Sequence, residues 1–299
     1  MKAAGVQVVA ALAVHPLSVE LIALLLRLGW LPPLDERQSL EVAAISSISS
    51  RGFLPSEWGM RPFRAPHHTA SAIAMVGGGS HPRPGEISLA HHGVLFLDEL
   101  PEYDRKVLEV LREPLESGRI VISRAARQAE FPARFQLIAT MNPCPCGYLG
   151  DPGGRCRCRD EQIRRYRERI SGPLLDRIDM HIEVPNMAPE MLREERGPRG
   201  ETSAEVRARV VQAFAVQLSR AGKPNHLLAD GEVQRYCPLS REDGRLLEAV
   251  ISKFNLSARS LHRILKVART IADLGRSAGI ATPHLKEAVS YRCLERPAD

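Results

Sequence analysis

The chain has 299 residues, of which 44% are apolar and 25% charged, so it is long enough for two globular domains with buried cores. Its formal net charge of +6 fits contact with a polyanion, although a solvated basic surface gives the same balance. Aromatic residues amount to 5%, which disfavours a base-stacking platform for single-stranded nucleic acid.

The apolar run over residues 3–14 imitates a short secretory signal. His15, Pro16 and Glu20 interrupt it, and it is too short to span a bilayer. We therefore predict a cytoplasmic protein that does not enter a membrane.

Residues 34–48 show a helical spacing of apolar side chains, and Asp35 is a suitable N-cap. Residues 50–92 are rich in Gly, Pro, Ser and His, which predicts an ordered insertion or a long loop instead of a core helix. This segment contains adjacent histidine pairs at 67–68 and 91–92. Adjacent side chains usually diverge, so loop polarity explains these pairs more simply than metal binding.

Two apolar runs, over residues 93–97 and 135–141, are typical of strands buried on both faces of a parallel sheet. Between them, residues 102–117 have helical spacing. Residues 120–122 and 131–135 bracket an Arg-rich turn, which predicts a β-hairpin. Strand, helix, hairpin and strand in this order predict an α/β fold with a parallel-sheet core.

The composition changes after residue 185, where prolines and glycines predict a linker. The segment that follows is mainly helical, which predicts a smaller helical domain over residues 199–299. The expected helices cover residues 204–218, 241–253 and 257–274, and a last one begins at Thr282-Pro283 with Thr282 as its cap.

Polar residues follow both predicted strands: Asp98 and Glu99 after the first, and Asn142 after the second. Ligands of open α/β sheets bind at the carboxyl ends of strands. Two acids there can hold Mg²⁺ and orient a water against the terminal phosphate of a nucleoside triphosphate, with Asn142 positioning that water. The alternatives are a strand that simply ends in solvent and an asparagine that only forms a turn.

Two arginines are further candidates for phosphate contact. Arg177 can act as an arginine finger on the nucleotide of a neighbouring subunit, and a salt bridge to Asp176 or Asp179 is the alternative. Arg259 opens the helix predicted over residues 257–274, where it can reach a phosphate or be solvated.

Four cysteines, Cys144, Cys146, Cys156 and Cys158, form two C-x-C pairs separated by nine residues in a Gly- and Pro-rich loop. Four thiolates in so short a loop can close a tetrahedral Zn²⁺ site. The spacing departs from the commoner C-x₂-C pattern, so reduced structural thiols and regulatory oxidation stay open as alternatives.

A phosphate-binding loop has the pattern G-x-x-x-x-G-K-[ST], and we find no segment of this kind in the printed sequence. Gly222-Lys223 is followed by Pro224 and lacks a glycine at the required upstream offset. We therefore expect nucleotide binding to be impaired, because no other part supplies the same cradle of backbone amides.

Several longer motifs resemble one family. They are RPFRAPHH at 61–68, VGGGS at 76–80, PRPGEISLAH at 82–91, GVLFLDELP at 93–101, MNPCPCG at 141–147 and LSAR at 256–259. Together they resemble the ComM (YifB) family of magnesium-chelatase-like AAA+ proteins, over about residues 31–292. The resemblance implies an ATP- and Mg²⁺-dependent hexameric ring that encircles DNA and promotes branch migration in natural transformation.

The resemblance also implies roles for single residues. Asp98 and Glu99 would be the Walker B pair, Asn142 sensor 1, Arg177 the arginine finger and Arg259 sensor 2.

The implied domains are an AAA+ core over residues 31–198, with an insert at 60–92 and a pore-facing hairpin at 119–134, and a helical lid over residues 199–299. Arg124 and Arg127 of the hairpin are then candidates for contact with the DNA backbone, which is independent of sequence.

Residues 1–30 depart from the family, whose members carry a Lon-protease-like domain and then the phosphate-binding loop in this region. We interpret them as a non-family segment produced by a truncated or frame-disrupted gene, a hypothesis that the upstream DNA sequence tests. Two other functions stay open: a non-catalytic ring or scaffold protein that acts only by binding, and a magnesium-chelatase subunit acting on a porphyrin.

Overall fold

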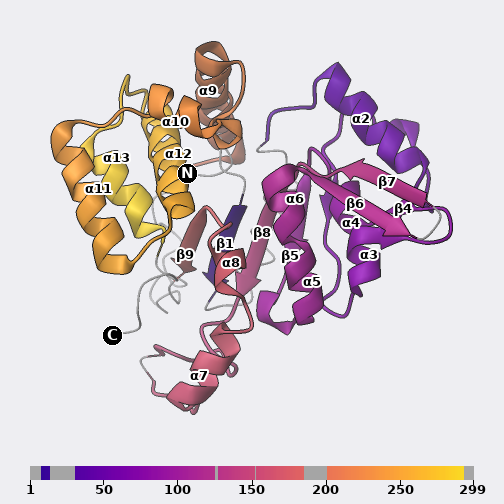
Figure 1. Ribbon diagram of the computed structural model, residues 1–299, viewed down its shortest axis with the longest axis horizontal. Coiled ribbons are helices and arrows are strands. Elements are labelled where there is room, and N and C mark those ends of the chain that lie inside the picture. Colours follow the sequence, from indigo (N-terminus) through magenta and orange to yellow (C-terminus); the bar gives the residue numbers. More distant parts are fainter. Residues whose placement is uncertain (1–7, 14–30, 125–126, 152, 185–200, 293–299) are drawn as a thin grey trace. The chain divides into compact units, whose positions relative to one another are not determined.

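The computed structural model describes residues 8–13, 31–124, 127–151, 153–184 and 201–292. The chain divides into two compact units, which Figure 1 colours along the sequence. The core unit comprises residues 33–177 together with residues 10–12, and the helical unit comprises residues 178–299 together with the remaining N-terminal residues. Within the ranges described, no helix combines the length and apolar character needed to cross a membrane.

A parallel sheet forms the centre of the core unit. It contains β2 (Phe63–Arg64), β5 (Val94–Leu97) and β8 (Gln136–Met141) in that spatial order, with β1 (Val8–Ala13) beside β8. All residues of β5 and β8 are buried, as their uninterrupted apolar runs predict. The predicted α/β class is confirmed.

The helix expected after residue 34 is α2 (Glu36–Ser47). Asp35 caps it as predicted, since its carboxylate accepts the N–H of Gln38 at 2.8 Å. The Gln38 side chain in turn accepts the N–H of Asp35, which completes a capping box.

The glycine- and proline-rich segment is an ordered insertion instead of an open loop. Its elements are η1 (Pro55–Glu57), α3 (Ala72–Val76), β3 (Gly77–Gly78), β4 (Arg83–Pro84) and α4 (Glu86–Leu89). Met75 and Ile87 are fully buried, so the insertion contributes to the core. The β3–β4 ribbon requires glycine at Gly77, because a Cβ there would lie 2.1 Å from the carbonyl oxygen of Arg83.

The prediction of one helix over residues 102–117 was wrong. After η2 (Leu100–Glu102), the chain forms α5 (Arg105–Val110) and α6 (Arg112–Ser117), with a break at Leu111. Pro114 explains the break, because it has no N–H to donate to the carbonyl of Val110, four residues earlier.

The hairpin predicted next is confirmed as β6 (Arg119–Arg124) paired antiparallel with β7 (Arg127–Pro132). Its two tip residues, 125–126, lie outside the described ranges. After β8, the core unit ends with α7 (Asp160–Arg167) and α8 (Gly172–Leu175).

The helical unit begins with β9 (Met180–Val184). Its helices are α9 (Ser203–Ala221), η4 (Asn225–Leu227), α10 (Asp230–Tyr236), α11 (Arg241–Phe254), α12 (Ala258–Leu274) and α13 (Thr282–Ser290). The helical character of this part is confirmed, and α10 was not predicted. Its core gathers apolar side chains of four helices, including Val233, Leu247, Ile264, Ala268 and Leu285.

Thr282 does not cap α13 as predicted. Ala281 occupies the N-cap position, and the Thr282 hydroxyl donates to Asp243 Oδ1 at 2.6 Å. The linker predicted after residue 185 and the domain boundary near residue 198 lie outside the described ranges, as do most of residues 1–30.

Candidate functional site

The carboxyl ends of β5 and β8 are joined by one buried hydroxyl. Thr140 of β8 donates to Asp98 Oδ1 at 2.5 Å and accepts the N–H of Glu99 at 3.2 Å. Asp98 and Glu99 are themselves exposed, whereas Thr140 is 2% exposed. Thr140 was not predicted, although a hydroxyl inside an otherwise apolar strand is a visible signal. The contact fixes the position of the Asp98 carboxylate at the edge of the sheet.

Glu99 adopts a left-handed backbone conformation, with φ at 51°. A non-glycine residue in this region costs of order 1–3 kcal/mol and is common at functional sites. The Glu99 N–H also approaches Asp98 Oδ1 at 3.1 Å, so Asp98 and Thr140 both stabilise the turn. The Glu99 carboxylate lies 3.7 Å from Nδ1 of His68, which belongs to the insertion.

Asn142 directly follows β8 and is partly buried. Its backbone forms a hydrogen bond with the hydroxyl of Tyr166 in α7. Burial and, next, the charge of Glu102 raise the pKa of Tyr166 to about 12, so the phenol stays protonated at neutral pH. The structure therefore brings the ends of β5 and β8, with Asp98, Glu99 and Asn142, to the same edge of the sheet.

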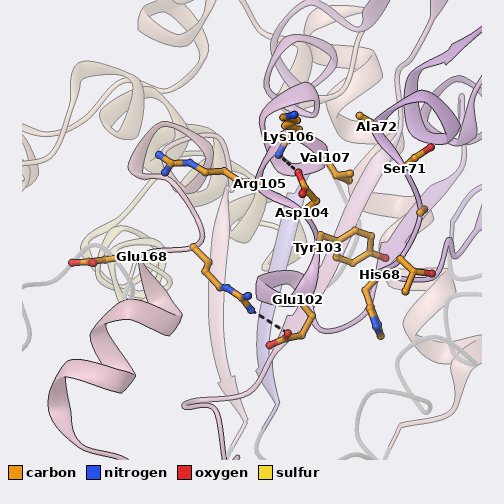
Figure 2. Close-up of a pocket in the computed structure, with 13 residues that line it drawn as sticks. His68, Ser71, Ala72, Glu102, Tyr103, Asp104, Arg105, Lys106, Val107 and Glu168 are labelled. Carbon is orange, nitrogen blue, oxygen red and sulfur yellow. Dashed lines mark hydrogen bonds and ion pairs between the residues drawn. The ribbon is translucent and has the colours of Figure 1, made fainter.

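A separate pocket of about 740 Å³ lies in the core unit (Figure 2). Residues 68–72, residues 102–107, Glu168 and Arg169 line it, and the three strand-end residues do not. Its charges are mixed, since Arg169 pairs with Glu102 at 3.0 Å. Burial and the charge of Asp98 raise the pKa of Tyr103 on its wall.

Arg177 is buried, with 7% of its surface exposed. Its guanidinium donates to the carboxylate of Glu116 and to the carbonyl oxygen of Pro173. The sequence alternative was a salt bridge to Asp176 or Asp179; the structure shows a salt bridge of Arg177 to Glu116, and Asp179 pairs with Arg263. A role as an arginine finger stays a prediction, and it requires the guanidinium to leave Glu116.

The other arginines predicted to contact phosphate lie in different places. Arg259 is an exposed residue in the first turn of α12, in the helical unit. Arg124 and Arg127 form the last backbone register pair of β6 and β7. Their roles as sensor 2 and as DNA contacts stay predictions.

Cys144, Cys146, Cys156 and Cys158 come together as free thiols, and their four Sγ atoms all lie within 4.8 Å of one another. Backbone N–H groups of Tyr148 and Arg157 lower the pKa of Cys146 to about 6. Hydrogen bonding to Cys146 raises the pKa of Cys158 to about 12. The pKa values of these two neighbouring thiols are thus shifted in opposite directions.

The second histidine pair is part of the core, so its explanation by loop polarity was wrong. His91 is 2% exposed, and its Nδ1 accepts the N–H of Arg134 at 3.0 Å. The neutral ring therefore carries its proton on Nε2, which donates to Glu41 Oε2 at 3.2 Å. His92 contacts the same oxygen at 2.7 Å. A metal at Nε2 of His91 would need that nitrogen unprotonated. Glu41, His91 and His92 therefore form a buried tie, a hydrogen-bonded contact between α2 and the insertion.

Two family models together match most of the chain. The family described as magnesium chelatase, subunit ChlI, matches residues 21–192, and the family described as its C-terminal part matches residues 200–292. The chain belongs to the magnesium chelatase ChlI family.

Within this family, the chain is similar to ComM and YifB proteins. It is 51% identical to competence protein ComM of Haemophilus influenzae and 50% identical to the uncharacterized protein YifB of Salmonella typhimurium, each over 90% of this chain and 52% of the relative. An uncharacterized protein of Mycobacterium tuberculosis is 40% identical over 88% of this chain and 53% of its own length. The chain thus spans about half the length of the curated relatives it matches, and the predicted ComM/YifB resemblance is confirmed.

Proposed function

We propose that the core unit is a AAA+ module that binds Mg²⁺ and a nucleoside triphosphate at the carboxyl ends of β5 and β8. The observation that carries the proposal is the Thr140 hydroxyl, which holds Asp98 and Glu99 together at that edge. A carboxylate is a preferred ligand of Mg²⁺, which keeps several waters when it binds phosphates. Asp98 then holds the metal, Glu99 orients the attacking water, and Asn142 hydrogen-bonds to it.

In the ring proposed for this family, Arg177 acts as the arginine finger. A guanidinium from a neighbouring subunit stabilises the charge that develops on the transferred phosphoryl group. In the single chain Arg177 is neutralised by Glu116, so we propose that assembly exchanges this carboxylate for nucleotide phosphate. The printed sequence offers no phosphate-binding loop, and we therefore expect weak nucleotide affinity.

Replacing Asp98 with asparagine tests the nucleotide site. Titration of a fluorescent ATP analogue in Mg²⁺ is expected to show saturable binding to the unchanged chain, weakened about tenfold or more in Asp98→Asn, because a metal ligand has lost its charge. Asp104→Asn is the matched control. It removes the same charge at the N-cap of α5, where asparagine caps equally well, so binding should not change.

Two results would contradict the nucleotide proposal: no saturable binding to the unchanged chain, or equal loss of binding in the Asp98 and Asp104 variants. The first of these would support the non-catalytic ring or scaffold function instead. DNA contact is tested separately from nucleotide binding.

We also propose that the tip of the β6–β7 hairpin contacts the phosphate backbone of DNA. The backbone register pairs Arg124 with Arg127, so two arginines adjoin the turn of the hairpin. The Haemophilus relative is named as a competence protein, which supports a role with DNA.

The Arg127→Ala variant should bind a labelled duplex more weakly and reduce the salt dependence of log K by about one phosphate contact. Fluorescence anisotropy over a series of salt concentrations measures both quantities. Arg119→Ala is the matched control, because Arg119 lies at the base of the same hairpin and is paired with Glu130. Equal salt slopes in the two variants would show that the tip has no special contact with DNA.

A further inference from the structure

The cysteine cluster lies in the loop between β8 and α7, outside the groups assigned to nucleotide binding. Cys144 comes two residues after Asn142, and Cys158 comes two residues before α7 begins. The five described cysteines are all free. The loop is therefore held by something other than a disulfide.

Distances between the sulfur atoms match a tetrahedral metal site. Sγ of Cys144 lies 3.4 Å from Sγ of Cys146 and 3.8 Å from Sγ of Cys156, and the last two atoms are 3.7 Å apart. Zinc binds thiolate sulfur at about 2.3 Å, so two sulfurs of a zinc tetrahedron are separated by roughly 3.8 Å. A disulfide bond would need about 2.05 Å instead.

The backbone folds the two C-x-C pairs toward each other. Gly147 and Gly154 have φ angles of 79° and 64°, and each closes a turn by donating its N–H to a carbonyl three residues earlier. Asp151 binds Arg155 through two side-chain hydrogen bonds of 3.0 and 2.7 Å, which ties the middle of the loop. The sulfurs are thus placed by local structure.

Most described residues of this loop are exposed or half-buried. Of the four cysteines only Cys144 is buried, and the segment between β8 and α7 has no regular secondary structure among its described residues. A loop of this length inside a compact unit usually needs a function or an added constraint. A metal supplies that constraint, because its binding free energy adds to the free energy of folding.

We propose that Cys144, Cys146, Cys156 and Cys158 hold one structural Zn²⁺ ion, which fastens the start of α7 to the end of β8. Four protein ligands leave no open coordination position, so the site is structural and not catalytic. This inference goes beyond the proposed nucleotide function and does not depend on it.

Metal analysis of the full chain, purified under reducing conditions without chelators, tests the site. Mass-spectrometric elemental analysis is expected to give about one zinc per chain. Cys146→Ser and Cys158→Ser should each reduce the zinc content several-fold. Cys237→Ser is the matched control, because Cys237 is a buried thiol of the helical unit. This variant should retain the zinc.

A second measurement does not depend on the folding of the variants. The unchanged chain, stripped of metal and loaded with Co²⁺, should show the strong thiolate-to-cobalt absorption of a four-sulfur site. The proposal is overturned by a chain that holds no zinc and gives no such absorption. It is also overturned if the chain contains iron in place of zinc, or if the Cys237 variant loses as much zinc as the others.

Discussion

The Asp273→Ala variant is expected to lose about 3–5 kcal/mol in the free energy of unfolding of the helical unit, because the substitution strands buried positive charge. The Asp273 side chain is fully buried and pairs with Arg220 and Arg269 at 2.7 and 2.9 Å. It also accepts a hydrogen bond from Asn225 at 2.9 Å. Arg269 is 3% exposed, so water cannot replace the missing carboxylate.

Urea denaturation followed by circular dichroism measures this loss as a shift in the midpoint of the unit's transition. Asp230→Ala is the matched control in the same unit. The Asp230 side chain is 82% exposed and pairs with His262, and exposed pairs contribute at most about 1 kcal/mol. A loss below about 1 kcal/mol for Asp273→Ala would show that its arginines are solvated after all.

Acidification from pH 7 to pH 4 is expected to destabilise the core unit by up to roughly 3 kcal/mol through His91 alone. Burial, followed by the charge of His92, lowers the pKa of His91 from 6.5 to about 4. Between pH 6.5 and about 4, His91 is therefore protonated in the unfolded chain but neutral in the folded chain. This stability is fully present above pH 6.5 and is lost as the pH falls toward 4.

Glu41 acts in the same direction at lower pH. Burial raises its pKa, but hydrogen bonds from His92, His91 and Arg37 outweigh burial and lower the pKa from 4.5 to about 2. Its contribution is present above pH 4.5 and fades as the pH falls toward 2. This carboxylate is 37% exposed, so solvent screening makes its effect smaller than that of His91.

Comparing urea midpoints at pH 7 and pH 4.5 for three chains isolates the histidine. His91→Gln should be less stable at pH 7 but show a smaller loss on acidification than the unchanged chain. His81→Gln, which changes an exposed histidine of the same insertion, should follow the unchanged chain. If all three lose the same stability on acidification, the buried tie does not control the acid sensitivity.

The elements that sequence alone predicts well are those whose pattern is local. The apolar runs of β5 and β8 require burial on both faces, and Asp35 caps α2 through residues only three positions away. The break before Pro114 was also readable, since a proline inside a helical pattern removes a hydrogen bond. That break is a missed signal and not a limit of the sequence.

Contacts between distant residues could not be predicted in this way. Glu41 and His91 are 50 residues apart, and Arg177 meets Glu116 from 61 residues away. Spacing favours near neighbours such as Asp176, because it contains no information on which segments the fold places side by side. The sequence predicted that the strand-end residues lie close together, because the ends of parallel strands meet at one edge of a sheet. The contact of the Thr140 hydroxyl with them could not be predicted, because it depends on the register between β5 and β8.

The shortness of β2 limits strand pairing at the outer edge of the sheet. An outer strand of only two residues, Phe63 and Arg64, offers a neighbouring chain few backbone groups to pair with. Phe63 is also stacked on Phe96, and Arg64 is held in an ion pair with Glu86. Fibril-like growth by strand addition is therefore disfavoured on this side. A second copy that met this edge would contact it through side chains and not through strand pairing.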